Sequence, residues 1–190
     1  MNKQSSKGKL TVIAGPMFSG KTGKLVALVE VFTRMGYKVL TVKPAIDSRY
    51  GGKKEIHSHD HKTSYALVIG KESAKDIVEK ILATGAKKVI VDEVQLFDKD
   101  MIIKVIMKLK KLGLHVIAAG LLYDYKRQPF GATPELMGLA DEHLELFAVC
   151  QKCGSLARHT ERRRGGKSLV VVGAADSYIA SCEQCHRVYR

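Results

Sequence analysis

The amino-acid sequence predicts an α/β fold, in which a mostly parallel β-sheet is flanked by helices and followed by a small cysteine-rich β lobe. From Leu10 to about Val149, short apolar runs alternate with stretches of helical periodicity, the pattern of parallel strands joined by right-handed crossovers. A glycine-rich loop separates the first predicted strand from the first predicted helix. All four cysteines follow the point where this alternation stops. We therefore predict one domain over residues 1–149 and another over residues 150–190.

The first predicted elements follow each other closely. Leu10–Ala14 is a short apolar run, and from Lys21 to Gly36 apolar residues recur at helical spacing. Lys38–Val42 predicts a second strand, which a proline soon follows. Ala45–Ser64 is polar with little periodicity, and its length favours a functional loop.

Three further strand and helix pairs complete the predicted sheet. Tyr65–Ile69, Val89–Val91 and Val116–Leu121 are apolar runs of strand length. Ser73 and Thr133 are the expected N-caps of the helices after the first and third of these runs, and the helix after the second is expected to start near Asp98. Pro134 at the first helical position supports the last of these caps. In the C-terminal lobe, the short β-like runs are Leu169–Val172 and Tyr178–Ser181.

The amino-acid composition limits the classes of protein to which this chain can belong. With 45% hydrophobic and 27% charged residues the chain is of ordinary globular composition, which excludes disorder and collagen. The 32 Lys and Arg against 19 Asp and Glu give a net charge of +13, which favours polyanionic partners such as nucleotide phosphates, nucleic acid or anionic lipid. No window approaches the roughly 18 to 20 apolar residues of a membrane span, and Met1–Lys9 lacks the apolar stretch of a secretion signal. We expect a cytoplasmic protein without a membrane partner.

The loop after the first strand carries a phosphate-binding motif. Gly-Pro-Met-Phe-Ser-Gly-Lys-Thr satisfies G-x-x-x-x-G-K-[ST], the P-loop pattern, between a strand and a helix N-terminus. Its backbone N–H groups and the helix dipole attract phosphate, the lysine adds charge toward the β- and γ-phosphates, and the threonine hydroxyl is suited to Mg²⁺. The predicted ATP and Mg²⁺ residues here are Gly15, Pro16, Met17, Phe18, Ser19, Gly20, Lys21 and Thr22.

Two carboxylates end the buried strand Val89–Val91. Asp92 and Glu93 stand where a P-loop sheet carries its metal-binding acid. Successive residues at a strand end point in different directions, so Asp92 can serve the metal while Glu93 faces the acceptor as a general base. The alternative is a pair of solvated acids before the next helix, which the nearby P-loop disfavours.

The cysteines form two CxxC pairs, and each pair supplies two thiolates from one turn. Four thiolates suit a tetrahedral, structural zinc site that leaves no ligand position for catalysis, and the alternative is free or redox-active thiols. The predicted ligands are Cys150, Cys153, Cys182 and Cys185.

Two polar runs permit more than one interpretation. His57, His59 and His61 could face one side of an extended loop and bind a metal, but a polar loop near phosphate or solvent is favoured. The basic run Arg162–Lys167 is expected to be a solvated turn, with contact to phosphate or nucleic acid as the alternative.

These motifs, together with Lys43–Tyr50, Asp92–Phe97 and Gly120–Gly131, resemble the thymidine kinase family of the cellular, zinc-containing type, in order from Lys9 to Arg190. The resemblance implies ATP-dependent phosphorylation of thymidine, and of deoxyuridine, at the 5'-hydroxyl, for nucleotide salvage and DNA precursor synthesis. It also implies a homotetramer, feedback inhibition by thymidine triphosphate, and no nucleic-acid partner.

The resemblance also implies roles for individual residues. Glu93 matches the family's base, and the residues that match its phosphate site are Asp47, Arg49, Asp92, Glu93, Val94 and Gln95. A lasso-like loop in the C-terminal lobe reads the pyrimidine, and an aromatic residue stacks on it. The residues that match this nucleoside site are Met17, Leu121, Tyr125, Phe130, Thr160, Leu169, Val170, Val171, Val172, Gly173 and Tyr178.

The chain departs from the family at three positions. Leu122 replaces an Asp, Tyr125 replaces a Phe and still allows stacking, and Ala174 replaces a Gly in the lasso. The competing hypothesis is a zinc-ribbon nucleic-acid-binding ATPase, which the net charge favours. It would need a second helicase-like core or an arginine–aromatic platform, and neither is visible. A non-catalytic nucleotide sensor is disfavoured by Glu93.

Overall fold

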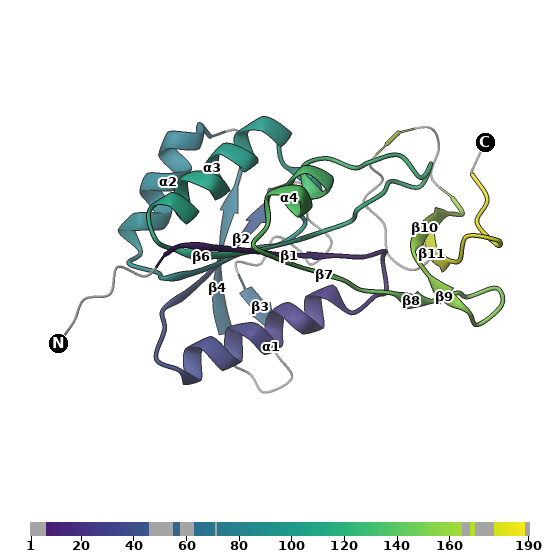
Figure 1. The fold of residues 1–190 in the computed structure, drawn as a ribbon, viewed down its shortest axis with the longest axis horizontal. Helices are drawn as coiled ribbons and strands as arrows, with labels where there is room; N and C mark the ends of the chain where they lie inside the picture. Colours follow the sequence, from purple (N-terminus) through teal and green to yellow (C-terminus); the bar gives the residue numbers. More distant parts are fainter. Residues whose placement is uncertain are drawn as a thin grey trace.

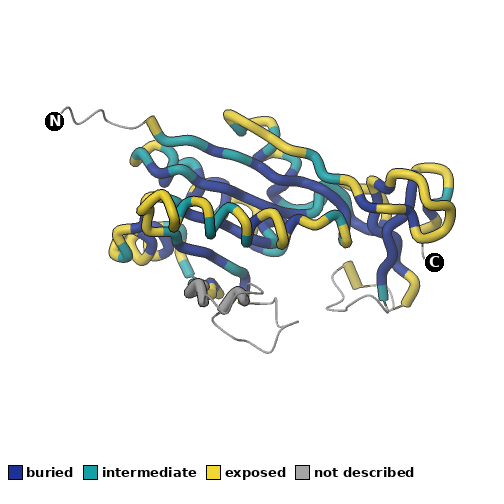
Figure 2. Tube along the Cα trace, turned by 90° about the horizontal axis from the view of Figure 1, so that it is seen from below, coloured by how far each residue is buried: buried dark blue, intermediate teal, exposed yellow. Residues whose placement is uncertain are grey.

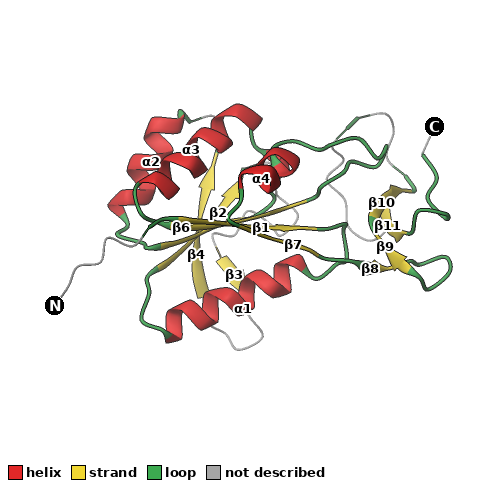
Figure 3. Cartoon of the chain, in the orientation of Figure 1, coloured by secondary structure: helices red, strands yellow, loops and turns green. Residues whose placement is uncertain are grey.

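A computed structural model confirms the predicted α/β fold (Figure 1). The structure describes residues 7–45, 55–57, 63–70, 72–164, 168–169 and 177–188. In those ranges a central sheet has helix α1 on one face and helices α2, α3 and α4 on the other, and a small lobe extends beyond one end of the sheet (Figure 1; Figure 3). Within the described ranges, every helix is too short or too polar to traverse a lipid bilayer.

The described sheet has the strand order β3-β4-β2-β5-β6-β1-β7, and every pairing in it is parallel except that of β3 with β4. Its strands are β1 (Lys9–Ala14), β2 (Val39–Pro44), β3 (Glu55–His57), β4 (Thr63–Ile69), β5 (Lys88–Val91), β6 (His115–Gly120) and β7 (Glu142–Glu145). The helices are α1 (Lys21–Arg34), α2 (Ala74–Ala83), α3 (Lys99–Lys111) and α4 (Thr133–Leu139), with a 3₁₀ turn η1 (Val94–Leu96).

The apolar runs form the core as expected. Val89, Ile90 and Val91 on β5 are buried, because successive side chains of a central strand face the helices on opposite sides of the sheet. Figure 2 shows buried residues running in a band along the sheet between the exposed outer sides of the helices. The predicted cap Ser73 is confirmed, since its Oγ accepts from the Asp76 N–H at 3.2 Å. The helix expected to start near Asp98 does so, and Asp98 Oδ1 caps it by accepting from the Met101 N–H at 2.8 Å.

The predicted cap of the last helix was wrong by one residue. Ala132 is the N-cap of α4, Thr133 is already helical, and no side chain caps the helix. The Thr133 side chain is buried instead, and its hydroxyl faces Gly120, where an added Cβ would lie 2.5 Å away. Packing against β6 therefore uses the side chain that was expected to cap the helix.

Two strands of the sheet were not predicted. Glu55–His57 lies inside the stretch expected to be a loop and pairs with β4 in antiparallel fashion. β7 pairs with β1 at the edge of the sheet, and most of its side chains are exposed. A three-residue strand and a polar edge strand both lack the apolar run that marked the others.

The described part of the C-terminal lobe, together with the two residues before it, forms two antiparallel pairs, β8 (Ala148–Val149) with β9 (Leu156–Ala157), and β10 (His159–Arg162) with β11 (Tyr178–Ser181). β11 confirms one predicted strand. Of the other run only Leu169 is described, and residues 170–172 lie outside the described ranges. A small core of Ala148, Cys150, Ala157, Ala180 and Cys182 holds the two pairs together.

The basic run was wrongly interpreted at its first residue. Arg162 ends β10 with 2% of its surface exposed, whereas Arg163 and Arg164 are exposed as expected. Residues 165–167 lie outside the described ranges. The strand extends one residue further into the run than its composition suggested, so its first arginine points into the protein.

Candidate functional site

The chemistry-bearing residues gather where parallel strands end at a common edge of the sheet. β1 leads into the P-loop, β5 into Asp92 and Glu93, and β6 into Leu121. Ligands of open α/β sheets bind outside these carboxyl ends. The same edge faces the C-terminal lobe, because the Met17 N–H in the P-loop donates to Thr160 Oγ1 on β10 at 2.9 Å.

The P-loop has a tightly closed backbone. Lys21 is buried, and its Nζ donates to the carbonyls of Gly15 at 3.0 Å and Pro16 at 2.7 Å. Ser19 Oγ donates to the same Pro16 carbonyl at 2.8 Å. A Cβ added at Gly15 would lie 2.6 Å from a backbone oxygen, so this turn requires glycine. Thr22 opens α1 and is exposed, where its hydroxyl is accessible to a ligand.

Asp92 is buried at the end of β5 with 4% of its surface exposed. Its Oδ1 accepts from the Glu93 N–H at 2.9 Å. Burial raises the pKa of Asp92 to about 6, and the adjacent Glu93 charge adds to the rise. The positive charges of Lys43 and Lys21 oppose it. Asp92 thus places a carboxyl oxygen beside the P-loop lysine, where it could share a divalent cation with a bound phosphate.

Glu93 has a backbone conformation that non-glycine residues seldom adopt, with φ 51° and ψ 43°. Such conformations persist where surrounding contacts hold them, and they cluster at functional sites. Here the Glu93 N–H donates to Asp92 Oδ1 at 2.9 Å and the Glu93 carbonyl accepts from the Leu96 N–H at 2.9 Å. The carboxylate is restrained by Gln95, whose Nε2 donates to Glu93 Oε2 at 2.6 Å.

Gln95 is itself fixed between two strand ends. It is 4% exposed, and its Oε1 accepts from the Leu121 N–H at 3.1 Å beyond the end of β6. Gly131, at φ 57°, approaches so closely that a Cβ would lie 2.4 Å from the Gln95 carbonyl oxygen. The amide of Gln95 thus joins the end of β6 to the Glu93 carboxylate, a role that its motif alone did not indicate.

The residues predicted to bind the nucleoside are only partly brought together. Tyr125 and Tyr178 are buried and both contact Arg162, while Thr160 contacts Met17. The residues at intermediate exposure are Leu121 and Phe130, and Leu169 is exposed. The predicted residues that lie outside the described ranges are Asp47, Arg49, Val170, Val171, Val172 and Gly173, as is Ala174. Of the three histidines, only the backbone of His57 is described, so the metal hypothesis for His57, His59 and His61 stays untested.

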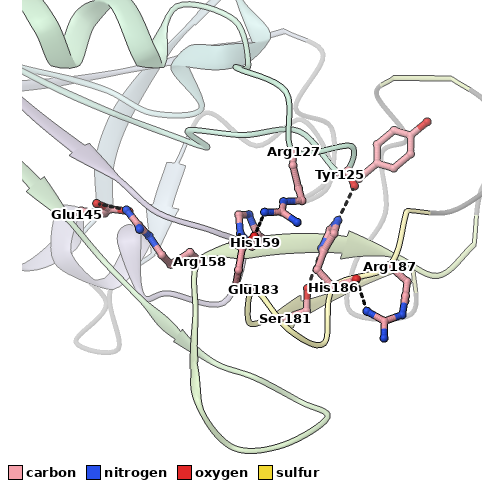
Figure 4. Close-up of polar contacts among 9 residues, drawn as sticks. All are labelled: Tyr125, Arg127, Glu145, Arg158, His159, Ser181, Glu183, His186 and Arg187. Atoms are coloured by element: carbon pink, nitrogen blue, oxygen red, sulfur yellow. Dashed lines mark hydrogen bonds and ion pairs between the residues drawn. The ribbon is translucent and has the colours of Figure 1, made fainter.

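The loop that carries Tyr125 is tied to the C-terminal lobe (Figure 4). His186 Nε2 donates to the Tyr125 carbonyl at 3.1 Å, which leaves Nδ1 to accept from Ser181 Oγ at 2.9 Å. Glu183 pairs with Arg127 of the same loop and with His159 Nε2, the latter at 2.7 Å. Sequence reasoning missed these polar links, because contacts between loops distant in the chain leave no periodic pattern.

The four cysteines converge as predicted. Their Sγ atoms lie within 4.8 Å of one another, and Cys153 Sγ is 3.6 Å from Cys182 Sγ. A zinc ion about 2.3 Å from each sulfur of a tetrahedron separates the sulfurs by about 3.8 Å, so the cluster fits such an ion. Hydrogen bonds with Cys153 and Cys182 raise the pKa of Cys185 to about 12, while the Cys182 N–H lowers the pKa of Cys150 to about 6. A bound cation would allow all four to ionise together.

Comparisons with known proteins identify the same family that the motifs resemble. A family model described as thymidine kinase matches residues 8–186 of this chain. A curated thymidine kinase of Mycoplasma mobile is 36% identical over 186 residues, which cover 98% of this chain and 90% of that relative.

Proposed function

Because the chain belongs to the thymidine kinase family and is therefore an enzyme that phosphorylates thymidine, we propose that it transfers the γ-phosphoryl group of ATP to the 5'-hydroxyl, with Glu93 as the general base. The observation that carries this proposal is the strained Glu93, held by Gln95 at the same sheet edge as the P-loop. Deoxyuridine is proposed as a second substrate, since it shares the sugar and most of the base.

The donor side of the proposed site consists of the P-loop and Asp92. Backbone N–H groups of the loop would surround the β- and γ-phosphates, with Lys21 at their side. Thr22 and Asp92 would hold Mg²⁺, which when bound neutralises charge on the transferred phosphoryl group. Asp47 and Arg49 are proposed to contribute from outside the described ranges on the strength of the resemblance.

The acceptor side depends on Glu93. In the proposed reaction, the thymidine 5'-oxygen attacks the γ-phosphorus while its proton passes to the Glu93 carboxylate. The new O–P bond forms as the bond between the γ-phosphorus and the β,γ-bridging oxygen breaks, which releases ADP and thymidine monophosphate. The hydrogen bond from Gln95 Nε2 supports this role, because it restrains the orientation of the carboxylate that would accept the proton.

The nucleoside is proposed to bind between the P-loop edge and the C-terminal lobe, where Met17 meets Thr160. Tyr125 would stack on the base, with Leu121 and Phe130 beside it and Tyr178 on the lobe. The cysteine cluster is proposed to hold a structural zinc ion, since four thiolates leave no ligand position for water or substrate.

Steady-state assays test the reaction. We expect ADP release that depends on thymidine, proceeds with deoxyuridine, and is indifferent to added DNA or RNA. Glu93→Gln should lower kcat by about 100- to 10,000-fold while ATP still binds. The matched control is Glu79→Gln, because Glu79 is exposed on α2.

The same assays address the nucleic-acid-binding ATPase. That alternative requires an ATPase stimulated by polymer, with binding that weakens steeply as salt rises. ATP turnover that rises with DNA and ignores thymidine would contradict the proposed function, and near-normal turnover in Glu93→Gln would contradict the role of Glu93.

Further properties are proposed from the family resemblance alone. They are a homotetrameric assembly, inhibition by thymidine triphosphate, a cytoplasmic location and a role in supplying DNA precursors. Sedimentation of the purified chain and a titration with thymidine triphosphate would test the first two directly.

A further inference from the structure

The strands β10 and β11 present different residues on their two faces. Because side chains alternate along a strand, Thr160 and Arg162 share one face of β10, and Tyr178 lies opposite Arg162 in the antiparallel register. That face contacts the P-loop, since Thr160 accepts from the Met17 N–H. Arg162 therefore extends the contact surface between the lobe and the candidate site.

The Arg162 guanidinium makes several directed contacts although the side chain is almost fully buried, with 2% of its surface exposed. Nη2 donates to the Leu169 carbonyl at 2.8 Å and to the Tyr178 hydroxyl at 2.9 Å. Nη1 donates to the Ser168 carbonyl. The guanidinium carbon lies 3.8 Å from the centroid of the Tyr125 ring and 5.3 Å from that of Tyr178.

These contacts join three separate parts of the chain. Tyr125 belongs to the loop after β6, Tyr178 begins β11, and Ser168 and Leu169 lie between the strands of the lobe. Arginine is suited to this position because its planar donors reach several acceptors while its face stacks on an aromatic ring. At 3.8 Å the guanidinium covers one face of the Tyr125 ring, which closes that face to a stacking base.

We propose that Arg162 is a positioning residue of the nucleoside pocket, which orients Tyr125 and Tyr178 and anchors the chain at Ser168 and Leu169 for thymidine binding. This inference rests on the proposed assignment of Tyr125 and Tyr178 to that pocket. Arg162 acts on the nucleoside through these neighbours, and its burial separates it from the exposed arginines that follow it.

The test compares Arg162→Met, Arg162→Lys and the matched control Arg163→Met. Methionine removes the charge and the donors, and losing a charge-assisted hydrogen bond from the pocket is expected to raise the KM for thymidine about 10- to 100-fold. Lysine keeps the charge but not the planar fork, so its KM should lie between those of the methionine variant and the unmodified enzyme. Arg163 is exposed, and Arg163→Met should leave the KM unchanged.

Three readouts separate positioning from folding. The KM for ATP and kcat at saturating thymidine should change less than threefold, and bound metal should be retained. If Arg162→Met does not fold, Arg162→Lys carries the comparison. An unchanged or lower KM for thymidine in a folded variant, or an equal loss of affinity for ATP and thymidine, would overturn the proposal.

Tyr125→Leu distinguishes failure of this inference from failure of the proposed pocket. If Tyr125→Leu leaves the KM for thymidine unchanged, the pocket assignment itself is wrong. If Tyr125→Leu raises the KM and the Arg162 variants do not, only the role of Arg162 is wrong. Because Arg162 acts partly through Tyr125, the effects of Tyr125→Leu and Arg162→Met on the KM should be less than additive when combined.

Discussion

Replacing Gln95 should separate the effect of the orientation of Glu93, the proposed general base, from the effect of its acidity. The side chain is buried and makes two identified hydrogen bonds, to the Glu93 carboxylate at 2.6 Å and from the Leu121 N–H at 3.1 Å. Gln95→Met keeps a side chain of similar length and removes both bonds. Gln95→Glu keeps an acceptor for Leu121 but places a second carboxylate against Glu93.

The expected magnitudes follow from those two bonds. A hydrogen bond to a charged group contributes about 1.5 to 3 kcal/mol, and a buried N–H left without a partner costs about 1 to 3 kcal/mol. Gln95→Met should therefore lower the free energy of unfolding by about 2.5 to 6 kcal/mol, a large part of the total of about 5 to 15 kcal/mol that a domain possesses. A carboxylate released from its orientation by about 1 Å should lower kcat by up to about 100-fold.

Gln95→Glu has a distinct signature in pH dependence. Two carboxylates this close disfavour ionisation of both, so the base should ionise at higher pH. The acid limb of kcat should then move to higher pH, and it should move less in Gln95→Met, which removes a hydrogen bond to the ionised carboxylate but adds no charge. The assays are thymidine-dependent ADP release against pH and thermal unfolding of both variants, with Gln128→Met as the control because Gln128 is exposed. A folded Gln95→Met variant with unchanged kcat would refute the positioning of Glu93 by this amide.

Three further predictions concern the lobe, the far end of the sheet and a tight turn. Cys153→Ser should lose bound zinc, measured by elemental analysis, and raise the KM for thymidine more than that for ATP; full activity without metal would contradict a structural zinc. Burial lowers the pKa of His115 from 6.5 to about 4, so the unfolded chain binds a proton at higher pH than the folded protein does. The free energy of unfolding should therefore be highest above about pH 6.5 and decrease as the pH falls from there to about 4. His115→Gln should flatten this loss in thermal melts, and His143→Gln, at an exposed position, should not. Gly131→Ala should destabilise far more than Gly36→Ala, because both have positive φ but only the former Cβ meets backbone, at 2.4 Å; equal melting temperatures would contradict this.

Much of the fold could be predicted because its signals are local. Val89–Val91 is an uninterrupted apolar run, and such a run in a central strand has few alternatives to burial. Ser73 caps α2 through a hydrogen bond that spans three residues, so the spacing of Ser73 and Asp76 in the sequence is sufficient to identify the cap. The P-loop is equally local, since its glycines and lysine act within one turn.

The remaining features depend on contacts between distant segments. β7 is a strand because the edge of β1 offers free backbone groups, and its own exposed residues carry no apolar pattern. The Thr133 side chain does not cap α4 because it packs against Gly120, which lacks a side chain and lies 13 residues earlier in the chain. The orientation of Gln95 likewise depends on Leu121 and Gly131, so the motif predicted its place near the phosphate site but not its contacts.

The two faces of β10 connect the cysteine cluster to the proposed nucleoside pocket within one small lobe. Thr160 and Arg162 face the P-loop and Tyr125, whereas Glu161 accepts from Lys152 Nζ at 2.6 Å beside the first cysteine pair. The Glu161 carboxylate also accepts from the N–H of Arg187 at 3.0 Å, just after the second pair. A strand held on one side by the cysteine turns can keep a buried guanidinium fixed on the other. Glu161, which contacts the cysteine turns, and Arg162, which contacts Tyr125, are adjacent on β10, so a displacement of the cysteine turns should also displace Tyr125. The P-loop is joined to the same strand by the hydrogen bond from Met17 to Thr160.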